Sequence, residues 1–324
     1  MRALTWQGGS KVIVAEVPPP DPQAGWATVS VAYTGLCGTD LHICQGDHPR
    51  AQPGIILGHE VVGLLRDPAR GWPAGTPVLV NPLLSCGECR SCLTGNAHVC
   101  ERLGLLGIDA PGGAADFVAV PESQLVRLPD GISLRTAALV EPLAVAVRAV
   151  RRSGLRLGQS VHVVGAGPVG LLIANCARLS GASRVTVSEP APRRAATARA
   201  SGFGIAESPD RRADVVFDCT GHPAVAPTVL GWAANSGTVV TVGTYPGLVP
   251  TDLQSVTLRE LTVIGTRVYT PDDVAAAADL AGRDPFGLDA FVTGVLPVTD
   301  GPAAIGRLTA GTELKVLLEG PAAA

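Results

Sequence analysis

The stretch "SVHVVGAGPVGLLIANCARLSGASRVTVSEP", residues 160–190, contains a complete strand–turn–helix–strand pattern. An apolar run ends in glycines, an Ala- and Leu-rich helical segment follows, and a second apolar run ends at Glu189. Gly165, Gly167 and Gly170 have the G-x-G-x-x-G spacing of a dinucleotide-binding turn. The stretch therefore predicts a βαβ unit that binds a dinucleotide.

Each glycine of this motif has its own physical role. Gly165 permits the tight turn, Gly167 lets the backbone approach the pyrophosphate, and Gly170 allows the helix to pack closely on the strand. Pro168 and Val169 stand between them at the start of the helix, whose N-terminus faces the phosphates. A glycine-rich packing turn without a ligand is the alternative, and the flanking strands argue against it.

The acidic residue that ends the second strand bears on the choice between NAD and NADP. Glu189 stands about 20 residues after the last glycine, where a carboxylate binds the ribose hydroxyls and repels a 2′-phosphate. Arg193 and Arg194 follow, and a cation at this place accommodates NADP. A solvated helix face is the alternative for both arginines. We predict NAD as the preferred cofactor, keep NADP open, and include Arg194 among the cofactor-binding residues.

Further apolar runs on the C-terminal side indicate a parallel sheet. Val- and Ile-rich runs recur at 213–221, 237–244 and 261–268, and helical segments separate them, as in doubly wound α/β folds. Ligands bind at the carboxyl ends of such strands. This placement predicts cofactor contacts from Cys219, Thr220, Gly243, Thr244 and Thr266. We also expect Lys315, in "ELKVLLEG", to reach the pyrophosphate.

Residues 1–142 have a different pattern, with short strand-like runs separated by prolines and glycines. These runs are "KVIVAEV" (11–17), "WATVSVAYTG" (26–35), "TPVLVNP" (76–82), "AADFVAVP" (114–121) and "QLVRLP" (124–129). We predict an α/β protein of two domains. A discontinuous β-rich domain comprises 1–142 and 272–324, and a doubly wound Rossmann domain comprises 143–271.

Four of the eight cysteines lie in one short segment, "NPLLSCGECRSCLTGNAHVC", residues 81–100. Their C-x2-C-x2-C-x7-C spacing lets short turns fold several thiolates around one tetrahedral zinc ion. Redox pairs usually come as a single CxxC beside a βαβ unit, and disulfide frameworks are rare in reducing compartments. We predict a structural zinc site in a lobe at 81–104, with Cys86, Cys89, Cys92 and Cys100 as its ligands.

Four thiolates fill a tetrahedral site, so zinc catalysis requires a second site with an open position. The remaining candidates are Cys37, Thr39, Asp40 and His42 in "GLCGTDLH", His59 and Glu60 in "GHEVVG", and Glu141. Cysteine, histidine and a carboxylate together give three ligands and a vacant fourth position. Taken singly, each has a structural alternative, such as a core cysteine or a carboxylate at a helix N-terminus.

These residues, in this order, resemble the zinc-dependent medium-chain dehydrogenase/reductase superfamily, which includes the alcohol dehydrogenases, and the likeness covers almost the whole chain. In that family the cysteine of C-G-[ST]-D and the histidine of G-H-E bind the catalytic zinc, which corresponds to Cys37 and His59. The pair Glu141-Pro142 is similar to the branch of sorbitol, butanediol and threonine dehydrogenases, where a glutamate replaces the third ligand. Glu60 matches the family glutamate beside the metal, and the choice between Glu60 and Glu141 stays open.

The resemblance also implies the fold and the chemistry. The β-rich domain should be GroES-like and the Rossmann sheet six-stranded. Thr39 and His42 should form a proton relay, and Asp40 should orient the zinc-bound histidine. Zinc would stabilise the alkoxide of a secondary alcohol, which transfers hydride to NAD(P). The implied substrates are polyols, cyclitols, amino alcohols or hydroxy amino acids. The implied cofactors are two zinc ions per chain, one catalytic and one structural, and a nicotinamide dinucleotide.

Charge and hydropathy restrict the partners. A net charge of −3 gives no electrostatic reason to expect nucleic acid. The apolar segments are too short for a membrane span, and the start has no apolar signal region. We expect a cytoplasmic homodimer or homotetramer that acts on a small alcohol or ketone. The alternatives are a zinc-free quinone or enoyl reductase of the same superfamily, and a non-catalytic protein that binds zinc and nucleotide.

Overall fold

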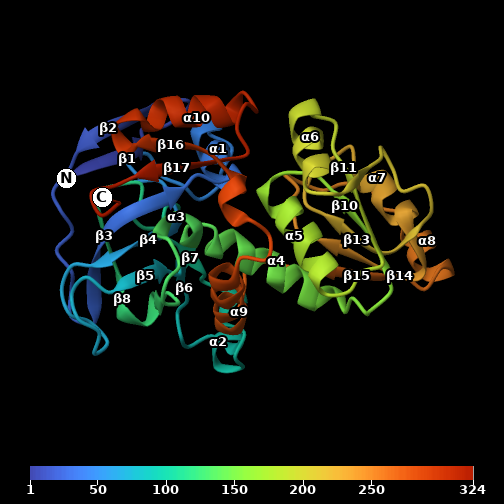
Figure 1. Ribbon diagram of the computed structural model, residues 1–324, viewed down its shortest axis with the longest axis horizontal. Helices are drawn as coiled ribbons and strands as arrows, with labels where there is room; N and C mark the ends of the chain where they lie inside the picture. The colour runs from blue at the N-terminus through green and yellow to red at the C-terminus, as the bar shows by residue number, and fades with distance from the viewer. Residues whose placement is uncertain (324) are drawn as a thin grey trace. The chain divides into compact units, whose positions relative to one another are not determined.

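The computed structural model describes residues 1–323, which form two compact units. The first unit comprises Met1–Glu141 and the chain from Thr270 onward, and the second comprises Pro142–Tyr269. Each unit is built around its own large sheet (Figure 1). The first unit is therefore discontinuous in sequence.

The main sheet of the first unit joins seven strands from distant parts of the chain. Its order is β16-β17-β3-β4-β5-β9, with β8 also paired to β3, and only β16 and β17 are parallel. The strands are β3 (Trp26–Gly35), β4 (Glu60–Leu65), β5 (Pro77–Val80), β8 (Phe117–Pro121), β9 (Leu125–Arg127), β16 (Val292–Pro297) and β17 (Lys315–Glu319).

Smaller elements surround this sheet. Two hairpins are formed by β1 (Arg2–Trp6) with β2 (Val12–Glu16) and by β6 (Leu83–Leu84) with β7 (Gly104–Leu105). The helices are α1 (Gly38–Gln45), α2 (Arg90–Leu93), α3 (Leu134–Ala137), α9 (Pro271–Arg283) and α10 (Gly301–Thr309). Short 3-10 turns are η1 (Ala97–Val99), η2 (Glu122–Gln124), η4 (Leu288–Phe291) and η5 (Val298–Asp300).

Valine side chains on β3 and its neighbours form the core of this sheet. Val29 and Val31 pack with Val61 of β4, Val78 of β5 and Val118 of β8, and all five are buried. Burying one such side chain stabilises the fold by about 1.5–3 kcal/mol. This packing holds β3 and β4 firmly together, and the candidate catalytic ligands stand at the ends of these two strands.

The second unit is a six-stranded sheet in which every pair is parallel, in the order β12-β11-β10-β13-β14-β15. Its strands are β10 (Ser160–Val164), β11 (Arg184–Ser188), β12 (Gly204–Ile205), β13 (Ala213–Asp218), β14 (Ala233–Thr241) and β15 (Thr262–Gly265). Its helices are α4 (Val140–Ser153), which begins in the first unit, α5 (Pro168–Leu179), α6 (Pro192–Ala200), α7 (Ala226–Val229) and α8 (Leu253–Leu258), with a 3-10 turn, η3 (Leu230–Trp232).

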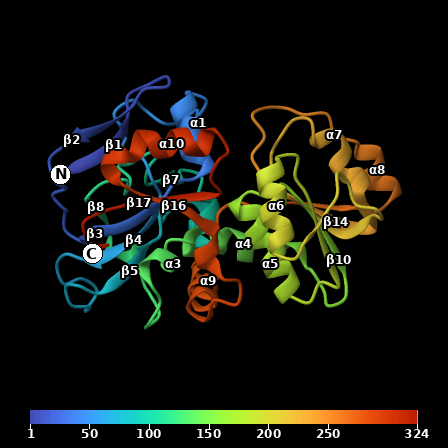
Figure 2. The same cartoon turned by 45° about the horizontal axis from the view of Figure 1, so that its top comes forward.

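The strand order reverses between β10 and β13, and the helices lie on both sides of this sheet (Figures 1 and 2). This confirms the doubly wound α/β fold expected from the apolar runs. The segment after Cys37, in which no helix is expected from the sequence, forms α1. Among residues 1–323, no helix combines the length and apolar character needed to cross a bilayer.

Candidate metal centres and nucleotide site

The four cysteines of the 81–104 lobe meet at one point. The sulfur atoms of Cys86 and Cys89 lie 3.9 and 3.5 Å from that of Cys92, and those of Cys86 and Cys89 lie 3.5 and 3.9 Å from that of Cys100. A zinc ion with Zn–S bonds of about 2.3 Å has tetrahedral S···S edges of about 3.8 Å. The arrangement therefore fits a closed tetrahedral zinc.

The thiols of this cluster do not ionise alike. The backbone N–H of Cys89 donates to the sulfur of Cys86 and, despite some desolvation, the pKa of Cys86 is lowered to about 6. Desolvation raises the pKa of Cys92 to about 12. Several thiolates packed together repel one another, and a cation at their centre would relieve that repulsion.

A second group of metal-type ligands forms where β3 and β4 meet. One donor atom each from Cys37, His59 and Glu60 lies within 4.8 Å of the others. The antiparallel register pairs Gly35 with Glu60, which brings the end of β3 to the start of β4. A Cβ atom on Gly35 would lie 1.9 Å from Oε2 of Glu60. Glycine at this position therefore leaves the space that the Glu60 carboxylate occupies.

Asp40 holds the two ligand-bearing segments together. Its Oδ2 accepts a hydrogen bond from the backbone N–H of Cys37 at 2.8 Å, and its Oδ1 accepts one from Gly58 at 3.1 Å. The resemblance implies that Asp40 orients the side chain of His59. In the structure, however, the two hydrogen bonds that Asp40 accepts come from the backbone at Cys37 and at Gly58, which precedes His59. Nδ1 of His59 is buried without a hydrogen-bond partner among the described residues.

The surroundings of His59 are strongly anionic. Burial opposes a charged imidazole, yet the negative charge of Asp40, with further contributions from Cys37 and Glu141, holds the pKa of His59 well above its usual value. An imidazole in such surroundings attracts a cation, which can be a proton or a metal ion. The donor set of sulfur, imidazole and carboxylate is one that zinc binds.

Lys315 lies at this metal group, and the expectation that it reaches the pyrophosphate is wrong. Its Nζ lies 2.7 Å from both carboxylate oxygens of Glu60 and donates to the carbonyl of Leu36 at 3.1 Å. The side chains of Lys315 and Glu60 are 2% and 1% exposed. Strand β17 pairs with β3, so the first residue of β17 faces the end of β3.

Glu141 stands in the first turn of α4 and is buried. Among residues 1–323, the group within 4.8 Å includes Glu60 and not Glu141. The charge of Glu141 nevertheless acts on both His59 and Lys315, whose pKa values it raises. Both glutamates therefore belong to the surroundings of Cys37, with Glu60 the nearer to the other two donors.

The expected relay residues lie on helix α1. Thr39 is half-buried, and its Oγ1 lies 3.9 Å from the sulfur of Cys37. His42 follows one turn later and is exposed. The hydroxyl thus stands beside the candidate metal site and the imidazole faces solvent.

The glycine motif has the geometry expected of a dinucleotide turn. Gly165 follows β10 with a positive φ of 98°, and Gly167 is the N-cap of α5, with Pro168 and Val169 as its first residues. A Cβ atom on Gly170 would lie 1.9 Å from the carbonyl oxygen of Gly165, so only glycine allows this contact. The N-terminus of α5 is thereby placed directly after the turn, where it can bind phosphate.

Glu189 lies beside this turn. Its Oε2 accepts a hydrogen bond from the N–H of Ala166 at 2.8 Å, and its Oε1 accepts one from Ala191 at 2.8 Å. The carboxylate is half-buried at the end of β11, and Arg194 is half-buried on α6. The structure therefore brings Glu189 to the glycine turn.

The remaining expected cofactor residues lie at the carboxyl edge of the parallel sheet. Cys219 and Thr220 follow β13, Gly243 and Thr244 lie two and three residues after β14, and Thr266 follows β15. The hydroxyl of Thr266 is buried without a hydrogen-bond partner among the described residues. Sequence reasoning did not single out the buried Asp218 at this edge, although its place at the end of a strand was a usable signal.

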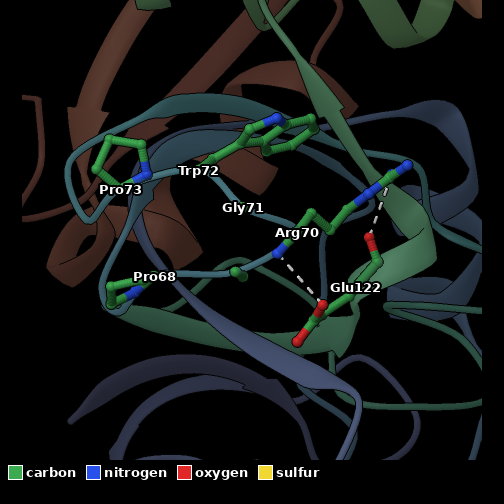
Figure 3. Close-up of a pocket in the computed structure, with 7 residues that line it drawn as sticks. Pro68, Arg70, Gly71, Trp72, Pro73 and Glu122 are labelled. Carbon is green, nitrogen blue, oxygen red and sulfur yellow. Dashed lines mark hydrogen bonds between the residues drawn. The ribbon is translucent and has the colours of Figure 1, made fainter.

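One surface pocket lies apart from these residues. It has a volume of about 450 Å³ and is lined by the loop 68–73 and by Glu122 (Figure 3). The guanidinium of Arg70 stacks 5.1 Å from the ring centroid of Trp72, and its backbone N–H donates to Glu122. None of the candidate metal or nucleotide residues lines this pocket.

Comparison with known proteins gives consistent matches along the chain. Two family models match, the alcohol dehydrogenase GroES-like domain at residues 23–130 and the zinc-binding dehydrogenase at 168–283. The 2-dehydro-3-deoxy-L-galactonate 5-dehydrogenase of Pseudoalteromonas atlantica is 34% identical, and the match covers 98% of each chain. The L-galactonate-5-dehydrogenase of Escherichia coli (strain K12) is 30% identical over 90% of this chain and 91% of the other. A zinc-binding dehydrogenase from Sinorhizobium meliloti 1021, solved bound to NADP, has a TM-score of 0.91 and 28% identity over 98% of each chain.

Proposed function

The chain belongs to the zinc-dependent medium-chain dehydrogenase/reductase superfamily, and from this premise we propose that it oxidises a secondary hydroxyl of a polyol or sugar acid with NAD(P). One observation carries the proposal. Cys37, His59 and Glu60 converge within 4.8 Å, separately from a four-cysteine cluster that already has a complete tetrahedral ligand set. A set of three ligands leaves a position at which a substrate oxygen can bind.

The residues at the first site have distinct roles in this proposal. Cys37 and His59 hold a zinc ion, and Glu60 is the third ligand, with Glu141 as the alternative carboxylate. When bound there, zinc acts as a Lewis acid that polarises the oxygen of the substrate. Asp40 keeps the ligand segments in place through the backbone N–H groups of Cys37 and Gly58.

The proton of the substrate hydroxyl needs a route to solvent. We infer that Thr39 accepts it and that His42 passes it outward. The 3.9 Å separation between Thr39 and the sulfur of Cys37, and the exposure of His42, support this order. A positioned relay of this kind typically contributes about 10²- to 10⁴-fold to the rate.

The second metal site has a structural role in this proposal. Cys86, Cys89, Cys92 and Cys100 bind a zinc ion that stabilises the 81–104 lobe. This gives two zinc ions per chain. The S···S separations of 3.5–3.9 Å support the closed geometry.

The dinucleotide binds to the second unit, with the pyrophosphate at the N-terminus of α5. Glu189 binds the adenosine ribose and favours NAD over NADP, because a 2′-phosphate would meet its negative charge. Arg194 keeps NADP open. The half-buried Glu189 carboxylate beside the glycine turn supports the NAD preference.

We further propose that the enzyme is a cytoplasmic homodimer or homotetramer. All eight cysteines are free thiols, which suits a reducing compartment. Strand β15 is the last of the parallel sheet and carries the exposed Val263, and Leu253 and Leu258 of α8 are also exposed. An open sheet edge with apolar side chains is a surface on which a second copy can pair.

A substrate screen tests the proposal. Polyols, aldonic acids, cyclitols, amino alcohols and threonine are offered with NAD⁺ and with NADP⁺, and the absorbance of the reduced nicotinamide is followed. We expect turnover with a polyhydroxylated substrate, because the relatives at 34% and 30% identity are named for sugar acids. Turnover that survives Cys37→Ser would contradict the zinc assignment and favour a zinc-free reductase.

Metal analysis separates the enzyme from a non-catalytic binding protein. We expect two zinc ions in the native chain and one in Cys37→Ser. NAD binding without turnover of any class in the screen, in a chain that holds both zinc ions, would favour a protein that only binds zinc and nucleotide.

A further inference from the structure

Asp218 is the last residue of β13 and is completely buried. It pairs in register with Val164 of β10 on one side and with Thr241 of β14 on the other. The strand order reverses between β10 and β13, and open α/β sheets bind their ligands at such a reversal. A buried carboxylate therefore stands at the edge where the dinucleotide is expected, outside the glycine motif.

Among the described residues, each hydrogen bond that Asp218 accepts comes from a neutral donor. Its Oδ1 accepts from the N–H and the hydroxyl of Thr220 at 2.9 and 2.6 Å, and its Oδ2 accepts from the hydroxyl of Tyr245 at 2.5 Å. Its backbone carbonyl accepts from the N–H groups of Val242 and Gly243. Three donors directed at one side-chain carboxyl match its ionised, acceptor-only form.

This carboxylate ties together the loops that follow β10, β13 and β14. A Cβ atom on Gly165 would lie 2.9 Å from the methyl group of Thr220, so the residue that Asp218 holds packs against the glycine turn. A Cβ atom on Gly243 would lie 2.2 Å from the backbone nitrogen of Gly221. These loops carry the expected cofactor contacts and pack closely against one another at the two glycines.

The negative charge of Asp218 acts on two neighbouring ionisable groups, Tyr245 and Cys219. Burial raises the pKa of the Tyr245 hydroxyl and of the Cys219 thiol, and the negative charge of Asp218 raises both further. Both groups lie, as Asp218 does, at the carboxyl edge of the sheet.

The nicotinamide half of the cofactor falls on the same side. Glu189 follows β11 and takes the adenosine ribose, and the glycine turn after β10 takes the pyrophosphate. The rest of the cofactor would then extend over the ends of β13, β14 and β15, where the hydroxyl of Thr266 has no hydrogen-bond partner among residues 1–323. NAD⁺ carries a positive charge on its nicotinamide ring that NADH lacks, so a buried anion nearby stabilises the oxidised form more.

We propose that Asp218, a buried carboxylate at the carboxyl edge of the parallel sheet, raises the affinity of this site for NAD⁺ relative to NADH, as a positioning residue that acts through its charge. The proposal rests on the proposed dinucleotide function.

Three dissociation constants test this in the zinc-loaded enzyme, for NAD⁺, NADH and ADP-ribose, the last of which lacks the nicotinamide. Asp218→Asn removes the charge while its amide keeps the size and can still bond both Thr220 and Tyr245. We expect the ratio of the NAD⁺ to the NADH dissociation constant to rise at least about threefold, as loss of a nearby charge requires. The affinity for ADP-ribose should stay within about twofold, since its binding lacks the charged ring.

Tyr245→Phe is the matched control, because it removes one donor and leaves the charge of Asp218. It should keep the wild-type ratio or move it further toward NAD⁺. If Asp218→Asn does not fold, Asp218→Ser removes the same charge with a smaller side chain and should give the same rise. Equal weakening of all three ligands, or no change in the ratio, would overturn the proposal. A wild-type chain that binds none of the three would instead refute the dinucleotide function itself.

Discussion

The buried ion pair between Lys315 and Glu60 gives the sharpest test of how the first site is built. Lys315 is expected from the sequence at the pyrophosphate, whereas in the structure its ammonium lies on Glu60, with both side chains at most 2% exposed. Lys315→Met keeps much of the length of the side chain and removes its charge. The two assignments predict opposite results for this variant. A lysine at the pyrophosphate predicts weaker NAD⁺ binding, whereas a lysine paired with Glu60 predicts a loss of stability with NAD⁺ binding unchanged.

The expected loss of stability follows from the burial of the pair. Removing the ammonium leaves the Glu60 carboxylate buried without the donor that lies 2.7 Å from each of its oxygens. Breaking a buried pair in this way costs about 3–5 kcal/mol. The carbonyl of Leu36 also loses its hydrogen bond, for about 1 kcal/mol more. The NAD⁺ dissociation constant should stay within about twofold, since the residue lies outside the dinucleotide site.

Urea unfolding followed by tryptophan fluorescence measures the stability, and titration calorimetry measures NAD⁺ binding. The exposed pair of Arg184 and Asp210 supplies the control, and Arg184→Met should cost no more than about 1 kcal/mol. The double variant Lys315→Met with Glu60→Gln should recover part of the loss, because the carboxylate that lost its partner is then itself neutral. A loss below about 1 kcal/mol in Lys315→Met, or a tenfold weaker NAD⁺ affinity at unchanged stability, would refute the reasoning.

Three further predictions concern other parts of the chain. Cys92→Ser should lose one zinc ion and several kcal/mol of unfolding free energy. Cys37→Ser should also lose one zinc ion, and it should lose all turnover while NAD⁺ binding persists. Metal analysis with calorimetry separates the two variants, and equal behaviour would contradict the assignment. Burial lowers the pKa of His162 to about 4, so the unfolded chain takes up a proton below its usual pKa of about 6.5 before the folded chain does. Stability should therefore fall as the pH drops from about 6.5 to 4, by up to about 3 kcal/mol more than in His162→Gln, and parallel pH profiles of the two proteins would count against this. Gly35→Ala should displace the Glu60 carboxylate, because the new Cβ would lie 1.9 Å from its Oε2. We expect a lower kcat, a loss of about 1–3 kcal/mol in the free energy of unfolding and an unchanged NAD⁺ affinity. A wild-type kcat would disprove the crowding.

The parts of the fold that the sequence predicts are those with a local signal. The glycine turn, the helix after it and Glu189 lie within one continuous stretch, and their spacing alone predicts their arrangement. The carboxyl-edge residues were also predictable, because parallel strands in one sheet end on the same side. The four cysteines stand close enough in sequence for short turns to bring them together.

The contacts that were missed join residues far apart in sequence. Lys315 and Glu60 are brought together only because β17 pairs with β3 and β3 with β4, and no local pattern fixes that register. Helix α1 went unrecognised because "GTDLHICQ" has no apolar face, and its start depends on Asp40 accepting from the N–H of Cys37. The bond from Tyr245 to Asp218 likewise depends on the pairing of β13 with β14.

Charge balance is the reason that we expect a divalent cation at the site of Cys37, His59 and Glu60, where a proton alone would not suffice. Asp40 and Glu60 are buried carboxylates at this site, and Lys315 pairs with Glu60. Zinc binding requires Cys37 as a thiolate, which adds a further negative charge. Burying charge that no partner balances costs several kcal/mol per ion. A divalent cation bound at the thiolate removes most of that cost and still offers a position for a substrate oxygen, whereas a proton on the same sulfur would cancel one charge and offer none.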